Sequence, residues 1–321
     1  MSLIEQAAKR LEQLRQAGVE LPEDRNSEYP PAPSARDSAA APRRRQMARR
    51  DVNSLGDSSQ AAPTDTSSAG KRVELDLDAI AASGLLVPSQ TRTLLASEFR
   101  VIKRPLIANA MTKGASSVNS GNLIMVTSAL PGEGKSFTSI NLAVSIAMEM
   151  DNTVMLVDAD VARPSVLGML GLPPAEGLLD VVTANSLDIS GVLLRTNIEK
   201  LSILPSGTPH ARATEWLASD AMIRLLDDMA QRYPDRIIIF DSPPLLATTE
   251  ARTLATHMGQ IVVVVQAGET AQAAVKEALS TIRDCPLKMM VLNQATQPVT
   301  ERYGYGYAYG YGYGYGYGNE D

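Results

Sequence analysis

The stretch IMVTSALPGEGKS, residues 124–136, decides the fold of this 321-residue chain. An apolar segment, typical of a buried strand, runs into a loop with two glycines, and the loop runs into a predicted helix over 135–150. Gly132 and Gly134 let backbone N–H groups curl around phosphate oxygens, because glycine has no Cβ that would clash. The positive end of the helix dipole adds to the attraction. The stretch therefore predicts a P-loop in its strand–loop–helix context.

The loop ends in a lysine and a serine whose chemistry suits a nucleotide. Lys135 is expected to reach the β- and γ-phosphates, and the Ser136 hydroxyl is expected to bind Mg²⁺. The consensus GxxxxGK[ST] has glycine where this chain has Ala129, the smallest alternative. The residues of this loop expected to contact the nucleotide are Pro131, Gly132, Glu133, Gly134, Lys135, Ser136 and Phe137.

Three aspartates follow two further apolar strands. Asp158 and Asp160 come at the end of VMLVDAD, and residues two apart point the same way if the chain is extended. Asp241 ends the apolar run RIIIFD, in the arrangement of a Walker B motif. Ligands of open α/β sheets bind at the carboxyl ends of the strands. Beside a P-loop, these carboxylates indicate metal and phosphate chemistry rather than three separate turn or helix caps.

Short apolar strands alternate with longer helical patterns along the middle of the chain. This alternation predicts an α/β fold of the P-loop NTPase kind, a mostly parallel sheet flanked by helices on both faces. The predicted strands cover 122–128, 153–158, 200–204, 236–240, 260–266 and 287–292. The predicted helices cover 89–110, with Ser89 as N-cap, 135–150, 212–232, 247–257 and 270–284.

Composition divides the chain into four parts. Residues 1–17 form a predicted short amphipathic helix, which either packs on the main domain or docks on a partner. Residues 18–71 are rich in Pro, Ser, Ala, Asp and Arg, and such a segment buries too little apolar surface to order itself, so we expect a disordered linker. A P-loop domain follows at 72–302. The Tyr/Gly-rich segment 303–321 is expected to be a disordered tail.

The overall composition excludes several classes of protein. The formal net charge of −6 gives no reason to expect nucleic acid as a partner. One cysteine, Cys285, excludes an intrachain disulfide, and two histidines are too few for a His-based zinc site. The N-terminus lacks the apolar core of a signal peptide, and the longest apolar runs, 237–240 and 261–265, are far short of the ~20 residues of a membrane helix. We therefore expect a cytoplasmic protein, recruited to the inner face of the membrane by a partner.

Three motifs together resemble the bacterial tyrosine kinases, which are relatives of the MinD/ParA-like ATPases. ALPGEGKS (129–136) resembles their Walker A motif, VMLVDADVARP (154–164) their Walker A′ motif, and IIIFDSPP (237–244) their Walker B motif. The resemblance extends over about 85–318. SEFRVIKRP (97–105) and the N-terminal helix look closest to the stand-alone autokinases associated with exosortase systems for polysaccharide export.

The resemblance implies ATP and Mg²⁺ as cofactors and assigns roles to particular residues. The implied catalytic residues are Lys135, Asp158, Asp160, Arg163 and Asp241, and the implied metal ligands are Ser136, Asp160 and Asp241. Asp158 would accept the proton of the attacking tyrosine, although the division of base and metal roles between Asp158 and Asp160 stays open. Arg163 would lie close to the phosphates, and Asn293 would recognise the adenine.

The resemblance also implies a substrate and partners. Tyrosine alternates with glycine, or once with Ala308, through the tail, and the implied phosphoacceptors are Tyr303, Tyr305, Tyr307, Tyr309, Tyr311, Tyr313, Tyr315 and Tyr317. The predicted function is tyrosine autophosphorylation between subunits, which regulates exopolysaccharide synthesis or export. The implied partners are further copies in a ring-type homo-oligomer, a membrane chain-length-determining (polysaccharide co-polymerase) protein as activator, and a tyrosine phosphatase.

Two departures from related sequences bear on this prediction. The family often has Glu-x-x-Arg-x-x-Arg for ring assembly, and this chain has Ser97, Arg100 and Lys103 there, with Glu98 one step off. MinD/ParA ATPases have a second lysine near the start of the P-loop, where this chain has Leu130 and Pro131. That absence argues against the first alternative, a positioning ATPase without kinase activity. A second alternative is a nucleotide-dependent scaffold of an export complex.

Overall fold

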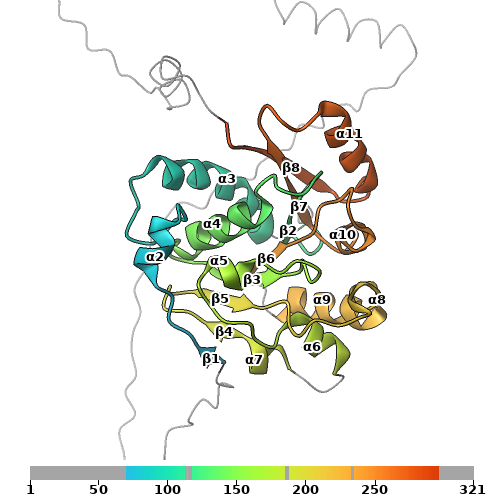
Figure 1. The fold of residues 1–321 in the computed structure, drawn as a ribbon, viewed down its shortest axis with the longest axis horizontal. Helices are drawn as coiled ribbons and strands as arrows, with labels where there is room; N and C mark the ends of the chain where they lie inside the picture. The colour runs from blue at the N-terminus through green and yellow to red at the C-terminus, as the bar shows by residue number, and fades with distance from the viewer. Residues whose placement is uncertain (1–69, 113, 115–117, 185–187, 233–234, 296–321) are drawn as a thin grey trace, which may run out of the picture. The chain divides into compact units, whose positions relative to one another are not determined.

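The computed structural model describes residues 70–112, 114, 118–184, 188–232 and 235–295 (Figure 1). The predicted N-terminal helix at 1–17, nearly all of the predicted linker at 18–71 and the tail at 303–321 lie outside the described residues. The first strand begins at Lys71, one residue before the predicted start of the domain.

The described residues form one eight-stranded sheet in the order β1-β4-β5-β3-β6-β2-β7-β8. Neighbouring strands are parallel except for β4 and β5, which are antiparallel. The strands are β1 Lys71–Arg72, β2 Leu123–Ser128, β3 Thr153–Asp158, β4 Leu194–Arg195, β5 Leu201–Leu204, β6 Arg236–Asp241, β7 Gln260–Gln266 and β8 Leu287–Asn293. The six strands predicted from apolar runs are all present, each within one residue of its predicted bounds.

Helices cover both faces of this sheet, as Figure 1 shows, with α3 and α4 on one side and α8 to α11 on the other. The helices are α2 Leu77–Ala82, α3 Leu94–Met111, α4 Lys135–Ala147, α5 Val166–Met169, α6 Leu178–Thr183, α7 Ile189–Val192, α8 Ala213–Leu217, α9 Asp220–Arg232, α10 Thr249–Ala255 and α11 Gln272–Thr281. Side chains alternate between the two resulting cores: Ile124 and Val126 pack with α3 and α4, whereas Leu123 and Met125 pack with α9 and α10. A strand buried on both faces is apolar throughout, which is why these runs were visible in the sequence.

All five predicted helices are shorter or divided in the structure, and the two that differ most do so because of local hydroxyl caps. The helix predicted from 89 begins at Leu94, and its N-cap is Thr93 rather than Ser89, because the Thr93 hydroxyl accepts the N–H of Ala96 at 3.1 Å. The helix predicted over 212–232 is two helices. The Ser219 hydroxyl accepts the N–H of Met222 at 3.3 Å, so Ser219 starts α9 anew after α8 has ended.

Lys103 joins α3 to α4 instead of lying on the surface. Its side chain is buried, and Nζ donates to the Ser145 carbonyl at 2.5 Å and pairs with the Glu149 carboxylate at 2.7 Å. Three positions align with the family's assembly motif. Lys103 is used for contacts within the chain, whereas Ser97 and Arg100 are exposed. Among the described residues, no helix combines the length and apolar character that crossing a membrane requires.

Two methionines in strands test which part of the sheet carries the stability. Met155 in β3 is 0% exposed and Met290 in β8 is 62% exposed. We expect Met155→Ala to lower the free energy of unfolding by about 2–5 kcal/mol, because it leaves a cavity between packed layers. Met290→Ala, the matched control, should change it by less than about 0.5 kcal/mol. Urea unfolding of both variants checks this, and equal losses would contradict the burial assigned to β3.

Candidate active site

The P-loop connects β2 to α4 and holds two glycines in the left-handed region. Gly132 has φ of 88° and Gly134 has φ of 92°, and Gly134 is the N-cap of α4. Glycine supplies no side chain to cap the helix, and the first N–H groups of an α-helix lack partners within it. These N–H groups are therefore available to an anion at the start of α4, where the helix dipole also favours negative charge.

Glu133 braces this loop from inside, which the sequence did not indicate. Its carboxylate is 2% exposed and accepts the N–H of Leu130 at 2.6 Å. It also accepts the hydroxyl of Thr270 and, at 3.5 Å, the N–H of Gln266. The prediction that Glu133 contacts the nucleotide is thus limited to its backbone, because its side chain is turned into the protein.

Asn293, at the end of β8, lies against the loop from a second side. Its Nδ2 donates to the Glu133 carbonyl at 3.0 Å, and a Cβ added at Gly134 would overlap that same nitrogen. Asn293 therefore lies against the P-loop, with its amide group engaged by the P-loop backbone. The predicted contact with adenine stays a prediction.

The three predicted aspartates meet beside the P-loop lysine. Asp158 and Asp241 are paired in the register of β3 and β6, so they end two adjacent strands. The Nζ of Lys135 forms an ion pair with Oδ2 of Asp160 at 2.8 Å. The sheet thus brings together side chains from the ends of β3 and β6, from the segment just after β3 and from the start of α4, and they lie at the carboxyl edge of the strands.

Asp158 is 1% exposed and is held by only one of its two oxygens. Oδ2 accepts the N–H groups of Ser165 at 3.1 Å and Val166 at 3.0 Å, whereas Oδ1 is buried with no hydrogen-bond partner among the described residues. Burial, together with the nearby charge of Asp241, raises the pKa of Asp158 to about 7, although the two N–H groups oppose the rise. Asp158 therefore has a free acceptor oxygen and an affinity for protons near neutral pH.

Asp241 is fully buried and has a similar division of its oxygens. Oδ1 accepts the Ser139 hydroxyl at 3.0 Å, and Oδ2 has no partner in the part of the chain that the structure describes. Burial raises the pKa of Asp241 to about 6, even though the nearby positive charge of Lys135 opposes the rise. Ser139 was not predicted, although it lies one helical turn after Ser136 and so shares its face of α4.

The residues at the site fit a Mg²⁺ ion whose coordination shell is completed by phosphate oxygens. The described residues include no group of three His, Cys, Asp or Glu side chains placed to hold a metal by themselves. Mg²⁺ usually takes one or two carboxylates and keeps waters and substrate phosphates as its other ligands. The unpartnered oxygen of Asp241, the carboxylate of Asp160 and the hydroxyl of Ser136 suit that partial set. The Ser136 hydroxyl accepts a hydrogen bond from Ser165 at 2.8 Å.

Other predicted site residues have different positions. Arg163 reaches Asp160 through its backbone, donating its N–H to the Asp160 carbonyl at 3.0 Å, while its side chain is exposed. The Phe137 side chain is partly buried and packs against the core on the α3 and α4 side. Pro131 is exposed and lacks an N–H group to donate. The tail tyrosines lie outside the described residues.

Comparisons with known proteins point to one kind of chemistry. Residues 121–295 match the family model described as an AAA domain. The tyrosine-protein kinase YwqD of Bacillus subtilis (strain 168) is 29% identical over 206 residues, which cover 64% of this chain and 83% of that protein. The succinoglycan biosynthesis transport protein ExoP of Rhizobium meliloti (strain 1021) is 30% identical over 197 residues, which cover 60% of this chain but only 24% of ExoP. The crystal structure of the chimerical protein CapA2B2 matches with a TM-score of 0.53 and 26% identity, covering 67% of this chain and 97% of that one.

Alanine substitutions at the two P-loop glycines distinguish the effect of backbone strain from the effect of steric overlap with Asn293. We expect Gly132→Ala to lower the free energy of unfolding by about 1–2 kcal/mol, because alanine is strained at positive φ and nothing lies near the added Cβ. Gly134→Ala should cost more, because the added Cβ also overlaps the Asn293 amide. Urea unfolding measures both, and a fluorescent ADP analogue should bind more weakly to Gly134→Ala. The double variant Gly134→Ala with Asn293→Gly should lose less stability than the sum of the losses in the two single variants, and full additivity would contradict the contact.

The raised pKa of Asp158 predicts a stability change with pH in the nucleotide-free chain. The folded chain holds the proton of Asp158 more tightly than the unfolded chain, so this contribution is full below the ordinary pKa of 3.8 and is lost as pH rises to about 7. Asp158→Asn removes it. Between those pH values the stability of Asp158→Asn minus that of wild type should rise by up to about 1.4 kcal/mol per pH unit. Denaturant unfolding at several pH values measures the difference, and a constant difference would refute the raised pKa.

Proposed function

Because the chain belongs to the AAA-domain family and is related to bacterial protein-tyrosine kinases, we propose that it transfers the γ-phosphate of ATP to tyrosines in its own C-terminal segment. The observation that carries the proposal is the junction of the P-loop with Asp158. A buried carboxylate with a free oxygen lies beside a loop built for phosphate, where a hydroxyl acceptor needs a base. An ATPase without kinase activity would bind the nucleotide in the same way. Whether the tail becomes phosphorylated therefore distinguishes the kinase from the ATPase.

Asp158 is the proposed base and Asp160 the proposed partner of Lys135. A tyrosine hydroxyl has a pKa of roughly 10 and must lose its proton as the phosphoryl group is transferred. Two N–H groups hold Oδ2 of Asp158, so Oδ1 is fixed in place as the proton acceptor. Asp160 is instead occupied by Lys135 at 2.8 Å. Their different partners in the structure support this division of roles.

The Lys135–Asp160 ion pair also suggests how the site receives ATP. The phosphates of ATP would replace Asp160 as the partner of the lysine, which keeps the Lys135 charge compensated before and after binding. The released Asp160 carboxylate would then join Asp241 and Ser136 around Mg²⁺, which neutralises negative charge on the β- and γ-phosphates. The N–H groups at the start of α4 would stabilise charge on the transferred group.

The position of the last strand supports the tail as substrate. β8 ends at Asn293, which touches the P-loop, and the first tail tyrosine, Tyr303, follows ten residues later. An extended chain covers roughly 3.3–3.6 Å per residue, so the residues between Asn293 and Tyr303 are long enough to let the tail reach a candidate site. We propose that it enters the site of a neighbouring copy, in a ring-type homo-oligomer.

We further propose a role in exopolysaccharide synthesis or export, with a membrane chain-length-determining protein as activator and a tyrosine phosphatase that resets the tail. The resemblance to ExoP, whose name gives succinoglycan biosynthesis transport, supports the polysaccharide role. Each phosphotyrosine adds about −1.5 to −2 charges at pH 7. Phosphorylated tails would repel one another in an assembly of acidic chains, so phosphorylation would disperse the oligomer and dephosphorylation would restore it.

Incubation with Mg²⁺ and ATP tests the kinase. With and without the cytoplasmic segment of the candidate membrane partner, we expect several phosphates on 303–321, seen by intact mass and peptide mapping. Lys135→Met should abolish them. Asp158→Asn should slow transfer by about 10²-fold or more, because it removes the base. Asp151→Asn changes an exposed aspartate and should have no effect. ATP hydrolysis with an unmodified tail under every condition would favour the positioning ATPase, and binding without turnover would favour the scaffold.

A mixing experiment separates transfer between copies from transfer within one. One chain carries Lys135→Met and an intact tail, and the other is active but has phenylalanine in place of its eight tail tyrosines. Neither chain alone should gain phosphate on its tail. Phosphate on the Lys135→Met chain after mixing is the expected result, and an unmodified mixture of chains that are active when intact would refute transfer between copies.

A further inference from the structure

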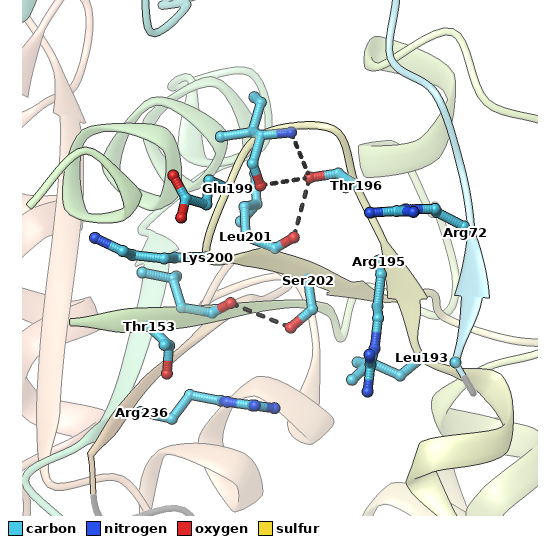
Figure 2. A pocket seen from close by; sticks show the side chains of 13 residues that line it. Arg72, Thr153, Leu193, Arg195, Thr196, Glu199, Lys200, Leu201, Ser202 and Arg236 are labelled. Atoms are coloured by element: carbon cyan, nitrogen blue, oxygen red, sulfur yellow. Dashed lines mark hydrogen bonds between the residues drawn. The ribbon is translucent and has the colours of Figure 1, made fainter. Parts of the chain in front are cut away.

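A cavity of about 620 Å³ lies at the end of the sheet opposite to the P-loop (Figure 2). It is lined by the first residues of three strands, Thr153 of β3, Leu201 of β5 and Arg236 of β6. The candidate active site is at the carboxyl ends of the same strands. Six strand residues span about 20 Å, so the cavity is a separate site.

The cavity has a strongly positive lining in an acidic chain. Four of its lining residues are cationic and one is acidic: Arg72, Arg195, Lys200 and Arg236, against Glu199. The whole chain has a formal net charge of −6. Figure 2 shows the Arg72, Arg195 and Arg236 side chains around this hollow, whereas the Lys200 side chain extends away from Arg72 and Arg195. Such a concentration of one charge in a hollow attracts anions.

Two of these arginines face each other across neighbouring strands. Arg72 of β1 and Arg195 of β4 are partners in the parallel register, so their side chains share one face of the sheet. Like charges directly opposite each other destabilise a strand pair. Among the described residues, neither side chain has a hydrogen bond or an ion pair that would compensate its charge. An anion between them would remove this repulsion.

The cavity wall also contains polar groups besides the arginines. The Oγ1 of Thr153 is buried and has no hydrogen-bond partner among the described residues. Lys200 has φ of 67°, and its Nζ donates to the carbonyls of Glu149 and Met150, each at 2.9 Å, so its charge is already held by backbone acceptors. Val154 and Ile198 add an apolar part to the lining, which could contact an uncharged group of a ligand.

We propose that this cavity binds a phosphate monoester with an aromatic or other apolar group attached. Guanidinium groups form paired hydrogen bonds with phosphate oxygens, and the volume is typical of small-molecule sites. The ester has two sources: a phosphotyrosine of the tail of another copy, which rests on the proposed function, or a free small monoester. In the first case the product of the reaction docks on a further copy, away from its active site.

Binding to the Lys135→Met chain tests the proposal without turnover. The probes are a synthetic peptide of residues 302–312 phosphorylated at Tyr307, the same peptide unphosphorylated, phenyl phosphate and inorganic phosphate. We expect saturable binding of the phosphopeptide in calorimetry, weakening with added salt. Arg72→Gln with Arg195→Gln should weaken it about tenfold or more, because hydrogen bonds to a charged group are lost.

Matched variants identify the cavity. Arg224→Gln with Arg283→Gln removes the same charge from exposed positions elsewhere and should leave binding unchanged. Arg195→Lys keeps the charge and loses the planar fork, so it should bind with intermediate strength and guards against misfolding of the double variant. Thermal unfolding checks each fold. Binding of phenyl phosphate but not of the phosphopeptide would assign the site to a free monoester.

Equal affinities in the two double variants, or no saturable binding of either monoester, would overturn the proposal. Synthetic probes make this result independent of the kinase assay. A chain without kinase activity that still binds them through Arg195 would refute the proposed function and leave the cavity assignment standing.

Discussion

Two aspartates, Asp158 and Asp241, are buried side by side at the ends of β3 and β6, and the candidate site is organised around the electrostatic cost of burying them. Desolvation raises the pKa of both, and each carboxylate is only half satisfied by hydrogen bonds. A protein that needed these positions only for stability would be better served by apolar residues, because a partly satisfied buried charge destabilises the fold. The cost is offset when a cation, a proton or a phosphate-bound metal arrives, so the arrangement favours ligand binding over stability in the empty state.

The P-loop keeps its shape through contacts that are distant in the sequence. Glu133 joins it to Thr270, on the connection from β7 to α11, and Asn293 joins it to the end of β8. Phosphate would therefore meet N–H groups that are already fixed, and little reorganisation is needed on binding. The same contacts hold the end of β8 beside the site, and the chain leaves this strand immediately after Asn293. The P-loop and the end of the last strand thus form one structural unit.

The sequence was informative where one physical signal dominated. The strands buried on both faces can be recognised as apolar runs in the sequence, and the P-loop can be recognised from the spacing of Gly132, Gly134 and Lys135. Short elements such as β4 and α7 were missed, because a few residues carry no periodicity and their conformation is decided by tertiary packing. The inward orientation of Glu133 was also out of reach. Its partner Thr270 is 137 residues away, and the motif leaves the side chain at that position unspecified.

Helix α4 relates the two ends of the sheet to each other. Its first residue is Lys135, at the phosphate loop, and the carbonyls of Glu149 and Met150 just beyond its last turn hold Lys200 at the rim of the basic cavity. Nearly all of the helix is buried, so it acts as a rigid spacer of about 20 Å. That length is about twice the screening length at physiological salt, so charge bound at one end is largely screened from the other. ATP in the P-loop and a phosphate monoester in the cavity would therefore bind without competing, and one copy could hold a phosphorylated tail while its own site works on another.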